Sequence, residues 1–405
     1  MLVLGDFHQP EGVSTLQRLK TDNLAALEAD LEEHSKGRPI ALVLPCLYSE
    51  LGTRALSTIV RELRDARYVG EIVVTLGNAD REQFEHAKEF FSVLPQRKRV
   101  IWNDGERIGE IYARLESEGI GVGGSGKGRA AWIAFGYVLG RGEGRVIALH
   151  DCDIVSYTRE ILARLCYPVT SPELDYEFCK GYYARVTDRL YGRVTRLFVT
   201  PVLRALKGLL GHLPLLVYLD SFRYPLAGEF SIAAELAGRI KTPSDWGLEI
   251  GTLAEVFSAV PAQRVCQADL CENYEHKHQN LSSQDPSAGL LRMCVDISRT
   301  LMRALAAEGV EIAEPFLGEL ASAYRGTAAE MLVRYRDVAS INGLAFDWDG
   351  EASAVSTFAE AIGIAERDFQ GDPASSPILP CWDGVISSIP DIFERLMRAV
   401  NDDNA

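Results

Sequence analysis

The feature that most constrains the fold is an alternation of short apolar runs with helix-prone stretches between residues 39 and 150. Residues 40–44 read Ile-Ala-Leu-Val-Leu, a continuous apolar run that Pro45 ends, as expected of a strand buried on both faces of a parallel sheet. Similar strand patterns recur at 71–76, 99–102 and 145–150. Helical patterns accompany them at about 52–66, 81–91 and 127–139. The alternation predicts an open α/β sheet with right-handed crossovers, whose ligands gather at the carboxyl ends of the strands.

Helical segments are predicted on both sides of this sheet pattern. Leucines at helical spacing, from Leu16 to Leu31, predict a helical arm that ends near Gly37. After residue 150, strand patterns fall at 178–184 and at 264–270, where the second could close the sheet, and helical patterns fall at 194–210 and 246–260. From about residue 286 onward the spacing of apolar residues is helical. We expect three parts: a helical arm at 1–38, a central sheet domain at 39–283, and a helical C-terminal segment at 284–405 that mediates a homodimer.

The net charge of −15 over 405 residues argues against broad contact with nucleic acid or an anionic membrane, because such surfaces attract excess lysine and arginine. An acidic small molecule would need a local basic pocket. The chain has no signal-peptide pattern at its start, and no run reaches the roughly 18 apolar residues of a membrane span. These features predict a cytoplasmic protein.

Eight cysteines are scattered through apolar segments without a Cys-x-x-Cys pair, which is typical of reduced, buried thiols. One cluster, formed by Cys266, Cys271, His276 and His278, has enough soft ligands for zinc. Its spacing is unusual, because structural zinc sites have about two to four residues between paired cysteines and longer arms before the histidines. We expect free thiols and keep zinc as the alternative.

Two Asp-x-Asp triplets occur, at 151–153 and 347–349, and a chain this rich in aspartate should contain on the order of one by chance. Their contexts differ. The first comes directly after a predicted buried strand, where an open sheet places its ligands, and the second lies in a glycine-containing loop of the helical tail. Paired carboxylates suit Mg²⁺ or Mn²⁺, which can neutralise a diphosphate. We expect a metal and phosphate site at 151–153, with a solvated turn as the alternative.

Residues 121–127 (Gly-Val-Gly-Gly-Ser-Gly-Lys) match the first seven positions of a P-loop. A P-loop nucleotide hydrolase is therefore the alternative from another functional class. Two departures count against it: Gly128 replaces the Ser or Thr that would bind Mg²⁺, and residues 108–118 look helical where a strand is required. The segment can still bind phosphate, because glycines allow close approach of the backbone and Lys127 adds a charge at a helix start.

Three further residues are site candidates. Glu229 and Glu249 lie in largely apolar surroundings beside glycines, where a carboxylate is costly unless it has a partner. A helix cap or a structural hydrogen bond is the alternative for both. His276 follows the predicted strand at 264–270, and a neutral imidazole there could complete the shell of a metal bound at Asp153. Taken alone, His276 is more often a surface residue.

Seven short motifs, in their order along the chain, resemble those of the glucosyl-3-phosphoglycerate synthases, a family of retaining glycosyltransferases with the GT-A fold. The motifs are Leu-Pro-Cys-Leu at 44–47 with Glu50, Gly-Lys-Gly at 126–128, Asp-Cys-Asp at 151–153, Gly-Arg-Val-Thr at 192–195, Pro-Leu-Ala-Gly-Glu at 225–229, Trp-Gly-Leu-Glu-Ile-Gly at 246–251 and Glu-His at 275–276. They span roughly residues 38–283. The resemblance implies a GT-A nucleotide-diphospho-sugar transferase fold, with a Rossmann-like mixed sheet, for the central domain.

The resemblance also implies roles for individual residues. The donor nucleotide would contact Pro45, Cys46, Leu47, Glu50, Lys127, Asp151 and Cys152. The metal, Mg²⁺ or Mn²⁺, would be bound by Asp153 and His276. The phosphate and carboxylate of the acceptor would be bound by Arg193, Val194 and Thr195, with help from His278. Glu249, and more loosely Glu229, would orient the sugar and acceptor hydroxyls, and these two form the implied catalytic set with Asp153.

The reaction that the resemblance implies is metal-dependent transfer of glucose from a nucleotide-glucose to the 2-hydroxyl of 3-phosphoglycerate, with retention of configuration. The sequence departs from the family pattern at Cys152, where Ser is common, and at Ala227, where Gly is usual, and neither change removes a charged group. Mannosyl-3-phosphoglycerate synthases share this chemistry, so a GDP-mannose donor is an alternative. The residues do not separate UDP from GDP. A non-catalytic protein that binds sugar nucleotides is a further alternative.

Overall fold

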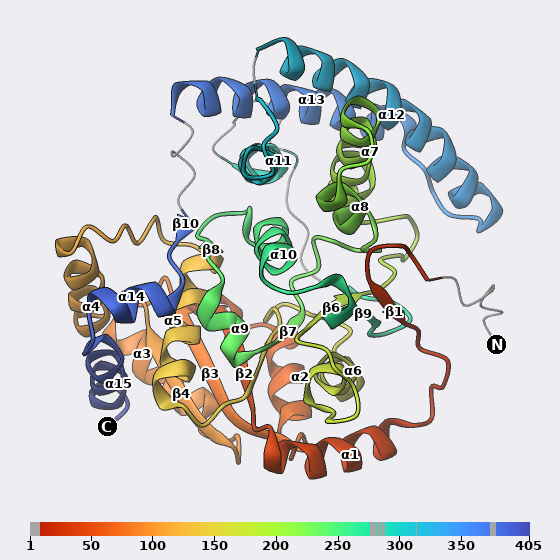
Figure 1. The fold of residues 1–405 in the computed structure, drawn as a ribbon. Coiled ribbons are helices and arrows are strands. Elements are labelled where there is room, and N and C mark those ends of the chain that lie inside the picture. Colours follow the sequence, from red (N-terminus) through yellow and green to blue (C-terminus); the bar gives the residue numbers. More distant parts are fainter. Residues whose placement is uncertain (1–8, 276–280, 282–284, 286–287, 313, 373–377) are drawn as a thin grey trace.

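The computed structural model describes residues 9–275, 281, 285, 288–312, 314–372 and 378–405 (Figure 1). Its centre is a sheet of eight strands in the order β1-β9-β6-β7-β5-β2-β3-β4. The strands are β1 (Ser14–Leu16), β2 (Ile40–Leu47), β3 (Val69–Gly77), β4 (Arg97–Trp102), β5 (Val146–Leu149), β6 (Phe178–Tyr182), β7 (Phe230–Ala233) and β9 (Val265–Asp269). A short pair, β8 (Thr242–Pro243) and β10 (Ile378–Leu379), is antiparallel. The predicted α/β sheet is confirmed.

The half of the sheet formed by β5, β2, β3 and β4 is parallel, as predicted. The prediction that Pro45 ends the first strand was wrong, because β2 continues through Pro45 to Leu47. β5 pairs with β2 only as far as Val43, while β3 follows β2 to its end. One edge of β2 is therefore free of a neighbouring strand at Pro45, where proline cannot donate a hydrogen bond to a sheet.

The other half of the sheet contains the strands that the sequence patterns missed or misplaced. β7 was not predicted, and it runs antiparallel to both β5 and β6. Residues 14–16 form β1, where a helix was predicted, and β1 pairs in parallel with β9. The strand at the edge is thus β1, and the expectation that the strand at 264–270 closes the sheet was wrong. The helical arm begins only at Leu24.

The helices largely follow the predicted segments, with shorter ends. The helices are α1 (Leu24–Gly37), α2 (Arg54–Leu63), α3 (Arg81–Phe91), α4 (Glu106–Ser117), α5 (Lys127–Arg141), α6 (Arg159–Thr170), α7 (Thr200–Leu210), α8 (Pro214–Asp220), α9 (Ala234–Arg239), α10 (Leu248–Ala259), α11 (Gly289–Ala307), α12 (Glu314–Ile341), α13 (Trp348–Gly371), α14 (Trp382–Ser388) and α15 (Ile392–Asp403). A π-helical turn, η2 (Thr195–Val199), leads into α7, and Pro201 lies in the first turn of α7. A 3-10 turn, η1 (Tyr48–Glu50), follows β2.

Two of the helices beside the sheet begin at clear capping residues. The side chain of Thr53 accepts the N–H of Leu56 at the start of α2, and Asp80 with Gln83 forms a capping box at the start of α3. The long helix α5 is mostly buried and packs on β2 and β3. Its first residue, Lys127, is therefore held at a fixed position beside the sheet.

The C-terminal segment is helical, as predicted, and its helices form two groups (Figure 1). α11, α12 and α13 pack on one another, and α12 also packs on α7. α14 and α15 return to the sheet domain, where α15 packs on α4, α5 and β4. The rings of Trp132 in α5 and Trp382 in α14 stack with centroids 4.2 Å apart. The division into parts at 38/39 and 283/284 stays a prediction. None of the helices in the described part of the chain is both long and apolar enough to cross a membrane.

Candidate active site

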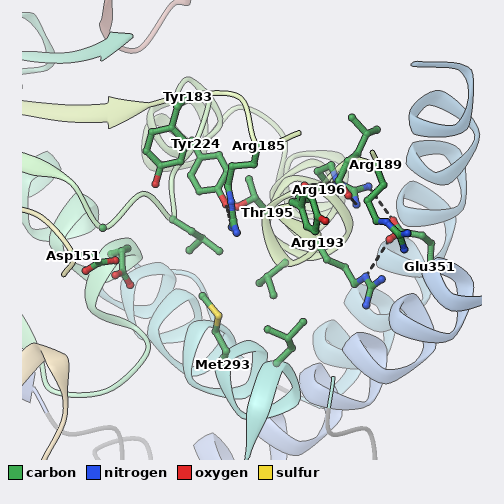
Figure 2. A pocket seen from close by; sticks show the side chains of 18 of the residues that line it. Asp151, Tyr183, Arg185, Arg189, Arg193, Thr195, Arg196, Tyr224, Met293 and Glu351 are labelled. Atoms are coloured by element: carbon green, nitrogen blue, oxygen red, sulfur yellow. Dashed lines mark hydrogen bonds and ion pairs between the residues drawn. The ribbon is translucent and has the colours of Figure 1, made fainter. Parts of the chain in front are cut away.

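A pocket of about 490 Å³ lies at the carboxyl ends of β5 and β6 (Figure 2). Its lining comes from the residues just after these strands, the first turns of α5 and α10, the segment 185–196, and parts of α11 and α13. The lining includes six residues named from the sequence: Lys127, Asp151, Arg193, Val194, Thr195 and Glu249. Residues predicted for the donor side and for the acceptor side therefore share one pocket.

Lys127 is the centre of a charged cluster at one end of the pocket. Its Nζ lies 2.6 Å from Oδ1 of Asp151 and 3.1 Å from Oε1 of Glu249. Burial alone would lower the pKa of Lys127, but Asp151 and Glu249 raise it more, so the net pKa lies above the ordinary lysine value. Lys127 therefore carries a positive charge at neutral pH, at the start of a helix, which is where a phosphate group is well stabilised.

Two glycines make this cluster possible. An ideal Cβ on Gly228 would lie 2.5 Å from Oδ2 of Asp151 and 2.7 Å from Nζ of Lys127. An ideal Cβ on Gly128 would lie 1.9 Å from the backbone oxygen of Pro243 in β8. The Ser or Thr that a P-loop requires would not fit at Gly128, and the element before this loop is helix α4 and not a strand. The geometry therefore weighs against the P-loop alternative.

Glu229 follows the pocket residue Gly228 and is fully buried. Its carboxylate accepts hydrogen bonds from the hydroxyls of Tyr183, at 2.8 Å, and Tyr274, at 2.5 Å. The two tyrosine rings stack with centroids 3.7 Å apart. Burial, with help from Asp151, raises the pKa of Glu229, and the two tyrosine hydroxyls oppose that rise. Glu229 is thus connected to the pocket through its hydrogen bond with Tyr183, and Tyr183 lines the pocket.

A second group of predicted donor and metal residues gathers where β2 and β5 end, and it does not line the pocket. The group consists of Pro45, Cys46, Leu47, Glu50, Cys152 and Asp153. The neighbouring thiol of Cys46, together with burial, raises the pKa of Cys152 well above its usual value. Leu47 is 47% exposed, whereas Glu50 is buried.

Asp153 lies among like charges. Burial raises its pKa to about 7, the carboxylates of Asp151 and Glu50 contribute to the rise, and Lys127 opposes it. Carboxylate oxygens that repel one another in this way fit a hard divalent cation, which would relieve the repulsion. The donor set beside the pocket therefore suits Mg²⁺ or Mn²⁺.

Both histidines named from the sequence, His276 and His278, lie outside the described residues. Within the described residues, no three His, Cys, Asp or Glu side chains converge as a complete metal site. Of the cysteines in the zinc alternative, Cys266 is a free, buried thiol in β9, and Cys271 is free and half-buried. Beside the pocket, the described part of the chain therefore offers carboxylates as ligands.

The other end of the pocket is basic, and two of its arginines share one carboxylate from the C-terminal segment (Figure 2). Glu351 in α13 accepts from Nε of Arg193 at 3.1 Å and pairs with Nη1 of Arg196 at 2.9 Å. Arg196 also donates to the backbone oxygens of Tyr191 and Leu190, at 2.8 and 3.1 Å. Arg196 thus fixes the turn that carries Arg193, and Glu351 holds Arg193 by its Nε, which leaves its terminal amino groups for a bidentate anion.

Thr195 and Asp347 also line the pocket, and they differ in whether the side chain has a hydrogen-bond partner. The buried Oγ1 of Thr195 has no hydrogen-bond partner among the described residues, which fits a hydroxyl that bonds to a ligand. Asp347, from the second Asp-x-Asp triplet, accepts the N–H of Gly350 at 3.0 Å. Asp347 therefore caps α13, and Trp348 and Asp349 lie in the first turn of that helix and not in the loop that the sequence pattern predicted.

Lys180 is a buried cation behind the pocket. It lies in β6, fully buried, and its Nζ has no hydrogen-bond partner within the described residues. Burial lowers the pKa of Lys180 from 10.5 to about 8, although Glu249 and Glu229 oppose this. The centroid of the Phe230 ring lies 5.7 Å from Nζ. A charge that is buried without a counter-charge beside it costs folding free energy.

Replacing Lys180 with Met is expected to stabilise the protein at pH 7 by roughly 3 kcal/mol. Below pH 8 the wild-type lysine is charged in both the folded and the unfolded chain, so the full cost of burial applies. Between about pH 8 and 10.5 the unfolded chain holds the proton that the folded chain has released, so wild-type stability rises with pH there and the advantage of the variant shrinks. Thermal melting of both proteins from pH 6 to 10 tests this, with the exposed Lys36→Met variant as control. An advantage that is constant across this range would contradict it.

The structure adds pocket residues that sequence reasoning missed, above all Tyr183, Arg185, Tyr224 and Glu351. Tyr183 and Arg185 directly follow β6, so the rule that ligands gather at strand ends could have found them. Nothing in the local sequence marks Glu351, because it lies in a helix of the C-terminal segment and meets Arg193 only through tertiary packing.

Three known proteins that are similar to this chain are each named glucosyl-3-phosphoglycerate synthase. A glucosyl-3-phosphoglycerate synthase of Persephonella marina is 44% identical over 402 residues, which cover 99% of this chain and 100% of that protein. One of Methanococcoides burtonii is 37% identical over 399 residues, 97% of each protein. The crystal structure of glucosyl-3-phosphoglycerate synthase from Mycobacterium tuberculosis, in complex with Mn²⁺, uridine-diphosphate-glucose and phosphoglyceric acid, aligns with a TM-score of 0.54 at 22% identity, over 73% of this chain and 88% of that one. This likeness confirms the GT-A type of fold. No protein-family model matches the chain.

Proposed function

This chain belongs to the glucosyl-3-phosphoglycerate synthase family, and from that premise we propose that its pocket transfers glucose from UDP-glucose to the 2-hydroxyl of 3-phosphoglycerate with retention of configuration. One observation carries the proposal: a single pocket joins the cluster of Lys127, Asp151 and Glu249 to a basic end that contains Arg193. A diphosphate donor fits the first end, and an acceptor that carries a phosphate and a carboxylate fits the second.

In the proposed mechanism, the chain binds and orients both substrates and stabilises the charge that develops on the diphosphate. Lys127 places its positive charge beside the diphosphate. Arg193 and Thr195 hold the acceptor so that its 2-hydroxyl faces the sugar from the side of the leaving group, as retention requires. The departing diphosphate takes up the hydroxyl proton, so Glu249 orients groups and does not act as a base. A divalent cation, Mg²⁺ or Mn²⁺, held by Asp153 would supply further positive charge when bound.

We propose UDP and not GDP as the nucleotide of the donor, because crystal structures of the M. tuberculosis relative contain UDP-glucose or UDP. The alternative within the class is mannosyl transfer from GDP-mannose. To separate them, the protein is incubated with Mg²⁺ or Mn²⁺, 3-phosphoglycerate and either UDP-glucose, GDP-glucose or GDP-mannose, and nucleotide release and glycoside product are measured. Product with UDP-glucose supports the proposal. Absence of product in all three mixtures would overturn it, and nucleotide release without an acceptor would favour a P-loop hydrolase.

Replacing Glu351 with Ala is expected to raise KM for 3-phosphoglycerate about 10-fold while KM for UDP-glucose changes little, because Arg193 and Arg196 lose the carboxylate that orients them. Initial rates at varied acceptor and at varied donor measure the two constants. Glu351→Gln keeps an acceptor atom for Nε of Arg193 and should be intermediate. Glu360→Ala, at an exposed position of the same helix, is the matched control. Equal increases in both KM values would contradict the positioning role.

The same proposal includes the cellular location of the enzyme, the bounds of its catalytic domain and its oligomeric state. We expect a cytoplasmic enzyme, a catalytic domain at 39–283, and a homodimer formed through the C-terminal segment. The dimer is supported by exposed apolar side chains on α12, namely Val333, Val338 and Ile341. Light scattering coupled to size-exclusion chromatography tests it, and a monomeric mass at micromolar concentration would contradict it.

A further inference from the structure

Arg185 differs from the other arginines of the pocket because it has no carboxylate partner in the part of the chain that the structure describes. Arg193 and Arg196 pair with Glu351, and Arg189 pairs with Asp188. Arg185 forms no ion pair within the described residues; its Nη1 donates to the neutral hydroxyl of Tyr224 at 3.0 Å, and its buried Nε has no hydrogen-bond partner there. A partly buried guanidinium without a counter-charge is costly, so this position is built for an anion that comes with the ligand.

The backbone around Arg185 is held rigidly. The N–H of Tyr274 donates to the backbone oxygen of Ala184 at 2.9 Å, and the N–H of Val186 donates to Oδ1 of Asn273 at 3.0 Å. The backbone oxygen of Arg185 itself accepts the N–H of Tyr191 at 2.9 Å. Arg185 is thus fixed at the end of β6 before any ligand binds, which lowers the entropic cost of binding.

Arg185 lies between the cluster around Lys127, where the donor is proposed to bind, and Arg193, where the acceptor is proposed to bind. Its partner Tyr224 packs on Tyr183 with ring centroids 5.0 Å apart, and Tyr183 bonds to Glu229, the buried residue next to the Lys127 cluster. Arg193 is held from the far side, by Glu351 of the C-terminal segment. Figure 2 shows the guanidinium of Arg185 directed into the pocket between Asp151 and Arg193. The pocket therefore offers two cationic positions along its length.

The proposed acceptor carries two anionic groups that match these positions. In 3-phosphoglycerate the carboxylate is attached to the carbon that bears the reacting hydroxyl, and the phosphate is one carbon further away. We propose that Arg185 binds the carboxylate of the acceptor while Arg193 and Thr195 bind its phosphate. Arg185 is then the residue that selects an acid over an alcohol next to the reacting hydroxyl. This inference rests on the proposed function, because it takes 3-phosphoglycerate as the acceptor.

Glycerol 3-phosphate tests the assignment because it keeps the phosphate and the 2-hydroxyl and lacks the carboxylate. The dissociation constants of both ligands are measured by calorimetry in the presence of Mn²⁺ and UDP, so that no turnover occurs. Arg185→Met is expected to weaken 3-phosphoglycerate about 10- to 100-fold, the effect of losing a charge-assisted hydrogen bond, and to change glycerol 3-phosphate less than about 3-fold. Arg193→Met is expected to weaken both ligands.

Controls separate this inference from the proposed function and from misfolding. Arg185→Lys keeps the charge and loses the planar fork, so its preference for the acid should fall between those of wild type and Arg185→Met. Arg61→Met, at an exposed position of α2, should leave both constants unchanged, and melting temperatures check folding. If Arg185→Met weakens both ligands equally, or neither, while wild type still makes product, the carboxylate assignment is overturned and the proposed function stands. If wild type binds neither ligand and makes no product, both are overturned.

Discussion

Replacing Asp153 with Asn is expected to lower kcat/KM for UDP-glucose by about 10³-fold, because the change removes a negative charge from the site proposed to hold the divalent cation. Asparagine has the size of aspartate, so the packing of this half-buried residue is retained. The rate of UDP release at saturating 3-phosphoglycerate measures the loss. Calorimetry with Mn²⁺ gives a readout independent of turnover, in which the variant should bind the ion about 10- to 100-fold more weakly.

The second Asp-x-Asp triplet supplies a matched control for this prediction. Asp349 is exposed in the first turn of α13, and Asp349→Asn should keep the wild-type rate and Mn²⁺ affinity. In EDTA the Asp153→Asn protein should melt no lower than wild type, since one charge has been removed from a cluster that repels itself. A wild-type rate together with wild-type Mn²⁺ affinity in Asp153→Asn would show that the cation is bound elsewhere.

The parallel half of the fold could be predicted from the sequence because its strands carry their own signal. β2 and β3 are buried on both faces, so nearly every residue in them is apolar, and the helices between them keep a separate helical pattern. The continuation of β2 through Pro45 could not be predicted, because it depends on where β5 ends beside it. Local sequence identifies a strand better than it identifies the strand's neighbours.

The other half depends on pairings between distant residues. β1 has three residues and pairs with β9, about 250 residues further along the chain, so no local period reveals it. The antiparallel direction of β7 is set by β5 and β6 on either side of it, and its four residues resemble any short apolar run. These elements are defined by tertiary contacts, which overrule local preference.

The candidate site likewise contains residues that local sequence identifies and residues that only tertiary contacts identify. Lys127 and Asp151 could be named from the sequence because they stand at the start of a helix and the end of a strand, where open sheets bind ligands, and Glu249 because it is a carboxylate in apolar surroundings. Glu351 could not be named, since its meaning comes from Arg193, 158 residues away. Arg185 shows a third situation: the sequence could have placed it after β6, but only the assembled pocket shows that it has no carboxylate partner among the described residues.

Replacing Lys127 with Met is expected to lower kcat/KM for UDP-glucose by about 10²- to 10³-fold and to raise KM for 3-phosphoglycerate far less, because Lys127 stabilises charge on the diphosphate and not on the acceptor. Asp151 and Glu249 would then face each other without their shared cation, which should also lower stability by roughly 2 kcal/mol. Initial rates, UDP affinity by calorimetry and thermal melting measure the three effects, with Lys36→Met as the exposed control.

If the activity loss came only from misfolding, rates at temperatures well below the melting transition would recover to those of wild type. If Lys127 served a P-loop hydrolase, the variant would lose nucleotide hydrolysis without an acceptor and Asp153→Asn would not. A wild-type kcat/KM in well-folded Lys127→Met would remove the charge stabilisation on which the proposed mechanism depends.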